Sequence, residues 1–182
     1  MSGTAYLAST DSALLRRALE GRSGGSCVEV GAGNGGALLE LSKGFGLVVG
    51  TDIVRPEVAD WKGAGVNYIL AEGASCLRSS TVDLVAFNPP YLSAEPADDR
   101  AVEGGLDLEV PKAFLTDALR VVRRGGVVVF LLNDEAKPQE FEEICGEHGF
   151  NMEAKESERV FFEELTVYVA RSPAGSELSG SH

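Results

Sequence analysis

The segment SCVEVGAGNGGALLELSKG, which runs from Ser26 to Gly44, decides the fold that we expect for this chain. It begins as a short apolar strand and passes through a glycine-rich turn. It then continues at Gly36 with the spacing of a helix that ends at Gly44. A strand that leads through a glycine turn into a helix is the opening unit of a parallel α/β sheet.

The rest of the chain repeats this alternation. Further strands are predicted within 46–52, 66–71, 81–88 and 125–133, helices within 12–19, 108–122 and 138–149, and two final strands within 151–160 and 164–172. Asp11 is predicted to cap the first helix. Almost wholly apolar strands separated by helices indicate a sheet that is covered on both faces. The sequence thus predicts a doubly wound α/β domain over residues 1–172, with a seven-stranded, mostly parallel sheet, an antiparallel C-terminal hairpin, and a disordered polar tail over residues 173–182.

The composition indicates an ordinary domain with an acidic surface. Hydrophobic residues make up 44% of the 182 residues, and 28 acidic against 16 basic residues give a net charge of −12. Because proteins that bind nucleic acid usually carry a basic stripe, this charge argues against a nucleic-acid partner. No stretch approaches the roughly 20 apolar residues of a membrane span, and no signal peptide opens the chain. We therefore expect a cytoplasmic protein without membrane contact or metal site, in which Cys27, Cys76 and Cys145 are buried reduced thiols.

The glycine turn after the first strand fits two kinds of ligand loop. Gly31, Gly33 and Gly36 match the dinucleotide pattern GxGxxG, and Asp52 follows Gly31 at the distance of a ribose-binding acid. On this pattern alone, the chain would be an NAD enzyme. A loop that serves only to make a tight turn is the structural alternative.

The same residues also fit the loop ExGxGxG, which binds S-adenosyl-L-methionine (AdoMet), through Glu29, Gly31, Gly33 and Gly35. The charge of the ligand separates the two interpretations. A carboxylate beside the loop would repel the pyrophosphate of a dinucleotide, whereas AdoMet carries an ammonium and a sulfonium, both of which a negative Glu29 would attract. The sequence therefore favours AdoMet over NAD.

The stretch VDLVAFNPPYLS places Asn88, Pro89 and Tyr91 at the end of the fourth strand, beside the end of the first. An amide or exocyclic amine is a poor nucleophile because its lone pair is delocalised. The Asn88 side-chain oxygen and a main-chain carbonyl can accept both N–H bonds of such a group, while the proline ring fixes the backbone and Tyr91 offers a flat face for stacking. The motif is typical of a clamp for a planar NH₂ group, although a rigid polar turn is the simpler alternative.

Together, EVGAGNG, TDI and FNPPY resemble the HemK-related N-methyltransferases of the seven-strand AdoMet-dependent class. STDSALLRRAL, VEGGLDLEVPKAFLTDAL and ESERVFFEELTVYVARS further resemble the archaeal and eukaryotic release factor glutamine methyltransferases, so that the likeness covers about residues 5 to 172. The resemblance implies that Asp52 binds the AdoMet ribose, Glu72 lies beside its adenine, and Asn88, Pro89 and Tyr91 hold the substrate amide. It implies the following cofactor contacts: Ser12, Glu29, Gly31, Gly33, Gly35, Asp52, Glu72 and Asn88.

The resemblance also implies a substrate and a partner. The substrate would be the glutamine of a Gly-Gly-Gln loop in the class 1 translation release factor. The partner would be a small zinc-binding activator subunit that pairs with the edge of the third strand. The apolar segment VNYILA agrees, because an uncovered apolar edge strand is an aggregation hazard, although a neighbouring helix or loop could cover it instead. Methylation of adenine N6 or guanine N2 in a nucleic acid, and AdoMet binding without catalysis, are the alternatives.

Overall fold

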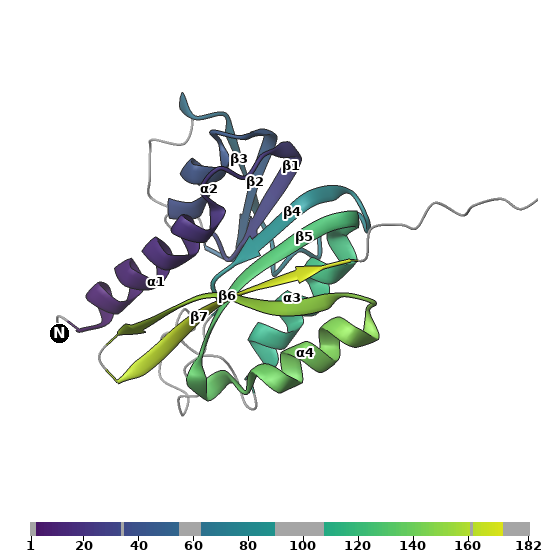
Figure 1. Ribbon diagram of the computed structural model, residues 1–182. Helices are drawn as coiled ribbons and strands as arrows, with labels where there is room; N and C mark the ends of the chain where they lie inside the picture. Colours follow the sequence, from purple (N-terminus) through teal and green to yellow (C-terminus); the bar gives the residue numbers. More distant parts are fainter. Residues whose placement is uncertain (1–2, 34, 55–62, 90–107, 161, 173–182) are drawn as a thin grey trace, which may run out of the picture.

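The computed structural model describes residues 3–33, 35–54, 63–89, 108–160 and 162–172. They form a seven-stranded sheet with the strand order β3-β2-β1-β4-β5-β7-β6 (Figure 1). The first five strands are parallel, and β7 runs antiparallel to both β5 and β6. Their bounds are β1 Gly24–Val30, β2 Phe45–Asp52, β3 Val66–Leu70, β4 Val82–Phe87, β5 Val122–Asn133, β6 Asn151–Val160 and β7 Glu163–Arg171. The predicted sheet, including its antiparallel C-terminal hairpin, is confirmed; the tail over 173–182 lies outside the described residues.

Helices cover the sheet on both faces, as Figure 1 shows. Their bounds are α1 Gly3–Leu19, α2 Gly36–Leu41, α3 Glu109–Val121 and α4 Pro138–Glu147, with a short 3₁₀ turn, η3, at Asp134–Ala136. On the face of α3 and α4, the ring of Phe87 in β4 stacks on that of Phe130 in β5, with 5.1 Å between centroids. Phe114 from α3 and Phe141 from α4 pack against these two rings. The α1 and α2 helices pack together on the opposite face. The central strands β1, β4 and β5 are therefore buried from both sides.

The first helix is longer than the sequence pattern predicted. It begins at Gly3, so Asp11 lies inside the helix with only 8% of its surface exposed. The prediction that Asp11 caps the helix is therefore wrong. The preceding segment TAYLAST contains no proline or glycine, and its alanines and leucine favour helix, so the helix continues toward the N-terminus.

The three cysteines are free thiols. Cys27 in β1 and Cys145 in α4 are buried, and burial is the main cause that raises the pKa of each to about 12. Cys76 is exposed, which contradicts the prediction that it is buried, because it lies in the turn between β3 and β4 rather than in a strand or helix. Among the helices that the structure describes, none combines the length and the apolar character that crossing a bilayer requires.

Candidate functional site

The predicted site residues converge at the carboxyl ends of neighbouring strands. Val30, the last residue of β1, pairs with Thr51 of β2 on one side and with Phe87 of β4 on the other. The glycine loop, Asp52 and Asn88 follow directly after these three residues. The sheet also reverses its strand order between β1 and β4. In doubly wound folds, ligands bind outside the carboxyl ends of the strands at this point.

The glycine loop has the left-handed backbone that its sequence predicts. Gly31, Gly33 and Gly35 have φ angles of 66°, 47° and 72°, values that residues with a Cβ rarely adopt. The Asp52 carboxylate holds this loop from the end of β2. Its Oδ2 accepts a hydrogen bond from the Gly33 N–H at 2.9 Å, and its Oδ1 accepts one from the Val54 N–H at 2.9 Å. The structure thus brings together the loop and the acid that the sequence assigned to one ligand.

Glu29 is buried in β1, with 6% of its surface exposed. Burial is the main cause that raises the pKa of its carboxyl to about 8; the nearby Asp52 charge adds to the rise, and a hydrogen bond to the backbone of Leu38 opposes it. The carboxyl is therefore mostly neutral at pH 7, which corrects the expectation of a negative charge there. Its Oε2 is buried without a hydrogen-bond partner among the described residues. A cationic donor placed at this oxygen would both pair it and favour its ionised form.

Asn88 lies one residue beyond β4 and is half-buried. Its Oδ1 is buried and accepts no hydrogen bond from the part of the chain that the structure describes. Pro89 is buried beside it, whereas Tyr91 lies outside the described residues. An unpaired buried oxygen costs stability unless a ligand pairs it, so Asn88 fits the predicted role of an acceptor.

The structure adds Asn133, which sequence reasoning did not assign to the site. It ends β5, is 1% exposed, and neither its Oδ1 nor its Nδ2 has a partner among the described residues. The signal that could have found it is the polar residue ending the apolar run VVVFLLN, as Asn88 ends VDLVAFN.

Glu72 and Ser12 are two further residues that the sequence assigned to the site. Glu72 is exposed in the turn after β3, and Ser12 is exposed on α1. The turn that follows Glu72 is fixed to α3, because Asp117 Oδ2 accepts the Ala74 N–H at 3.0 Å. Arg120 reinforces it by donating to the carbonyls of Ala74 and Leu77, each at 2.8 Å. Two side chains of α3 therefore set the position of the segment that carries Glu72.

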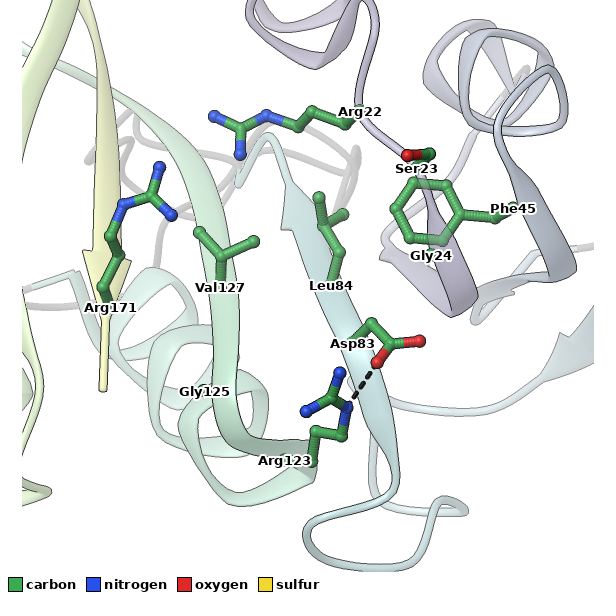
Figure 2. Close-up of a pocket in the computed structure, with 10 residues that line it drawn as sticks. All are labelled: Arg22, Ser23, Gly24, Phe45, Asp83, Leu84, Arg123, Gly125, Val127 and Arg171. Atoms are coloured by element: carbon green, nitrogen blue, oxygen red, sulfur yellow. Dashed lines mark hydrogen bonds and ion pairs between the residues drawn. The ribbon is translucent and has the colours of Figure 1, made fainter. Parts of the chain in front are cut away.

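A separate cavity of about 270 Å³ opens at the amino ends of the strands (Figure 2). Asp83 and Arg123 form an ion pair there, and Arg22 and Arg171 line it as well. The backbone N–H of Ser26 is the main cause that lowers the pKa of Asp83, and Arg123 contributes. Among the described residues that the sequence assigned to the site, none lines this cavity. The Asp83 carboxylate pairs with Arg123 and accepts the Ser26 N–H, so it joins β1, β4 and β5 at the end of the sheet away from the glycine loop.

Comparison with known proteins identifies the fold. No protein-family model matches the chain, and a search of curated proteins gives no significant match. Among solved structures, the E. cuniculi Mtq2-Trm112 complex, described as responsible for methylation of the eRF1 translation termination factor, matches with a TM-score of 0.73 and 25% identity over 90% of this chain and 95% of that one. A Bacillus halodurans putative methyltransferase matches with a TM-score of 0.64 and 14% identity over 90% and 99%. The T. thermophilus 16S rRNA N2 G1207 methyltransferase matches with a TM-score of 0.63 and 22% identity, over 94% of this chain and 44% of that one.

The seven-stranded sheet and its structural neighbours show the Rossmann-like fold of class I methyltransferases, and the T. thermophilus neighbour is described in complex with AdoMet. The residues present fit AdoMet, because the loop has three glycines at positive φ and Glu29 offers a buried oxygen to which no described residue donates.

Proposed function

We propose that this enzyme transfers a methyl group from AdoMet to the side-chain amide nitrogen of a protein glutamine. The proposed target is the Gly-Gly-Gln motif of the class 1 translation release factor. The observation that carries the proposal is the buried Oδ1 of Asn88, one residue after β4. It has no partner among the described residues and can accept an N–H of an incoming amide. The Mtq2-Trm112 match supports the choice of substrate, since that complex acts on a termination factor.

The chemistry asked of the chain is mainly positioning. AdoMet supplies an electrophilic methyl group on its sulfonium. Asn88 Oδ1 and the main-chain carbonyl of Pro89 accept the two N–H bonds of the substrate amide and direct its nitrogen at that methyl. Bound AdoMet would supply its methyl group to the oriented nitrogen and leave as the neutral thioether, and the amide would give up one N–H proton to solvent. Tyr91 stacks on the flat amide. The gain in rate comes from orientation and from oxygens that face the positive charge developing on nitrogen.

The cofactor contacts follow the ligand's polar groups. We propose that Glu29 pairs with the AdoMet ammonium and that Gly31, Gly33 and Gly35 let the backbone approach the ligand. The Asp52 oxygens, each of which already accepts one backbone N–H, retain lone pairs that can accept from the ribose hydroxyls. Glu72 lies on the adenine side. Ser12 contributes from α1.

The exposed edge of the sheet supports a partner subunit. Ile69 and Leu70 of β3 are 37% and 59% exposed, and Ile53 and Val54, which follow β2, are 60% and 63% exposed. A sheet edge with exposed apolar side chains is a surface that an added strand covers well. We propose that a small zinc-binding activator subunit pairs with β3, in line with the match to a two-protein complex. We also propose a cytoplasmic location, since free thiols agree with a reducing compartment.

The test is a transfer assay with radiolabelled AdoMet. Release factor, tRNA and DNA are each incubated with the enzyme, with and without the activator subunit, and the label is mapped by mass spectrometry. We expect label on the Gly-Gly-Gln glutamine. Asn88→Ala should abolish transfer while AdoMet affinity changes only a few-fold, and Asn151→Ala, an exposed residue at the start of β6, is the matched control. Unchanged turnover of Asn88→Ala would refute the clamp.

Methylation of a nucleic-acid base is the second candidate, because the Asn88 clamp suits any planar NH₂ group. The net charge of −12 argues against it, since binding to phosphates needs basic contacts. Label on tRNA or DNA instead of the release factor would favour it. AdoMet binding without label on any substrate would indicate a non-catalytic module.

A further inference from the structure

Asn133 is a polar side chain for which the described structure provides no partner. It is 1% exposed at the end of β5, and both its Oδ1 and its Nδ2 are buried without a hydrogen bond to any residue that the structure describes. Leaving both ends of a carboxamide unpaired is costly, and native proteins rarely do so. An apolar side chain would fill this place at lower cost, so Asn133 calls for a partner beyond the residues that the structure describes.

Strand register places Asn133 on the same face of the sheet as Glu29. Phe87 pairs with Phe130, and their stacked rings lie on the face of α3 and α4. Asn133 follows Phe130 by three residues in a continuous strand, so it faces the opposite side. Val30 pairs with Phe87, so Glu29, one residue earlier, also faces that opposite side. Both polar side chains thus belong to the α1 and α2 face.

Asn88 lies close to Asn133, because both stand at the carboxyl ends of neighbouring strands. It comes one residue after Phe87, whereas Asn133 comes three residues after Phe130 on the adjacent strand. With a strand spacing of about 4.8 Å and two further residues of about 3.3 Å each, their Cα atoms are roughly 8 Å apart. One carboxamide-sized group fits between two asparagine side chains at that separation. The two asparagines, whose Oδ1 atoms are buried without a partner among the described residues, therefore lie near each other at the carboxyl ends of β4 and β5.

The hydrogen-bonding needs of a glutamine side chain fit this pair. In the proposed function, on which this inference rests, Asn88 Oδ1 and a main-chain carbonyl accept the two N–H bonds of the substrate amide. The substrate's own carbonyl oxygen then still needs a donor. We propose that Asn133 Nδ2 donates a hydrogen bond to this carbonyl oxygen and so makes the site specific for a carboxamide. A primary amine has no adjacent carbonyl and would leave Asn133 unpaired.

The electronic consequence decides which kinetic constant depends on Asn133. A hydrogen bond to an amide carbonyl strengthens amide resonance and withdraws electron density from nitrogen. It therefore holds the substrate in the ground state and gives no extra help as the nitrogen attacks. Loss of such a ground-state interaction raises KM and does not lower kcat. Asn88, which faces the charge that develops on nitrogen, should instead affect kcat.

The test compares Asn133→Leu and Asn133→Ser with the wild-type enzyme on the full release factor, in the presence of the activator subunit. For Asn133→Leu we expect KM for the release factor to rise about three- to tenfold, with kcat and AdoMet affinity within about twofold of wild type. Asn133→Ser keeps a hydroxyl donor and should fall between the two. Asn151→Leu, at the exposed start of β6, is the control for the substitution.

Thermal unfolding without substrate separates this role from a structural one. If Asn133 serves a ligand, Asn133→Leu removes two buried polar atoms that no described residue pairs, and the variant should unfold at the same temperature as wild type or higher. A lower midpoint together with wild-type KM would overturn the inference, as would unchanged KM in both variants. Wild-type enzyme that labels no glutamine would overturn the proposed function and this inference with it. Wild-type turnover with unaffected variants overturns the inference alone.

Discussion

The substitution Glu29→Gln removes a buried carboxyl whose pKa differs between the folded and the unfolded chain. Burial raises the pKa of this group from 4.5 to about 8 in the folded chain. The carboxyl therefore stays protonated in the folded state over a pH range in which the unfolded chain has already lost the proton. Its contribution to stability is fully present below about pH 4.5 and is lost as pH rises through about 8.

The magnitude follows from linkage. A difference of one pKa unit corresponds to about 1.4 kcal/mol, so the wild-type free energy of unfolding should lose about 1.4 kcal/mol per pH unit from this group within the window. Over the whole shift from 4.5 to about 8, the loss is on the order of 5 kcal/mol. Glu29→Gln keeps the shape of the side chain and has no proton to lose, so this slope should disappear in the variant.

Denaturant unfolding at about pH 5.5, 6.5 and 7.5 measures the effect. The other titratable groups are the same in both proteins, so their contributions cancel in the comparison. We expect the free energy of unfolding of Glu29→Gln, relative to that of wild type, to increase by about 1.4 kcal/mol per pH unit. Glu142→Gln, which changes an exposed carboxyl on α4, controls for the substitution itself. If the free energies of unfolding of wild type and Glu29→Gln change in parallel with pH, Glu29 is not a buried, protonated carboxyl in the folded chain.

The same residue predicts how AdoMet binding depends on pH. If the AdoMet ammonium pairs with Glu29, binding must ionise a carboxyl that is mostly neutral at pH 7, and a proton is released. Affinity should therefore rise with pH up to about 8, and the heat of binding should depend on the ionisation enthalpy of the buffer. Glu29→Gln should bind AdoMet more weakly and lose both dependences. A wild-type binding enthalpy that is the same in every buffer would show that Glu29 does not ionise on binding.

Three further substitutions test the acid after β2, the glycine loop and the proposed partner surface on β3. Asp52→Ala should weaken AdoMet binding by roughly 1–3 kcal/mol in calorimetry, because it removes the acceptor of two backbone N–H groups as well as the proposed ribose contact. Gly33→Ala has free space around the new Cβ but a φ of 47°, so it should cost about 1–2 kcal/mol in denaturant unfolding through backbone strain alone. Leu70→Lys on the exposed edge of β3 should prevent co-purification with the activator subunit while the chain's own thermal midpoint stays within a few degrees of wild type. Normal recovery of the complex with Leu70→Lys would exclude the β3 edge.

The fold could be predicted because each strand carries its own signal. The apolar runs of β1, β4 and β5 differ clearly from the amphipathic helices between them, and glycine ends the first strand. Even the edge position of β3 followed from the resemblance and is confirmed by the strand order. The start of α1 could not be located because Asp11 fits a cap, whereas the helix-forming residues before it extend the helix to Gly3.

Only those parts of the site that a single sequence motif specifies could be predicted. The glycine loop and Asp52 meet as their spacing indicated, since the order of parallel strands brings the ends of β1 and β2 together. The neutral state of Glu29 could not be read from the sequence, because it depends on burial and on the neighbouring Asp52, both of which exist only after folding. Asn133 was missed for a related reason. Its position beside Asn88 comes from the pairing of β4 with β5 across more than 40 residues of chain.

Glu29, Asn88 and Asn133 share a property that links stability to function. They come from the adjacent strands β1, β4 and β5, and each holds at least one buried polar atom without a partner among the described residues. Each such atom costs roughly 1–3 kcal/mol when it stays unpaired, so a chain selected for stability alone would replace all three with apolar residues. An ammonium, the N–H bonds of an amide and an amide carbonyl would pair them one by one. We infer that the unliganded fold bears this cost because the partners arrive with cofactor and substrate, and that binding of both should stabilise the protein more than binding of AdoMet alone.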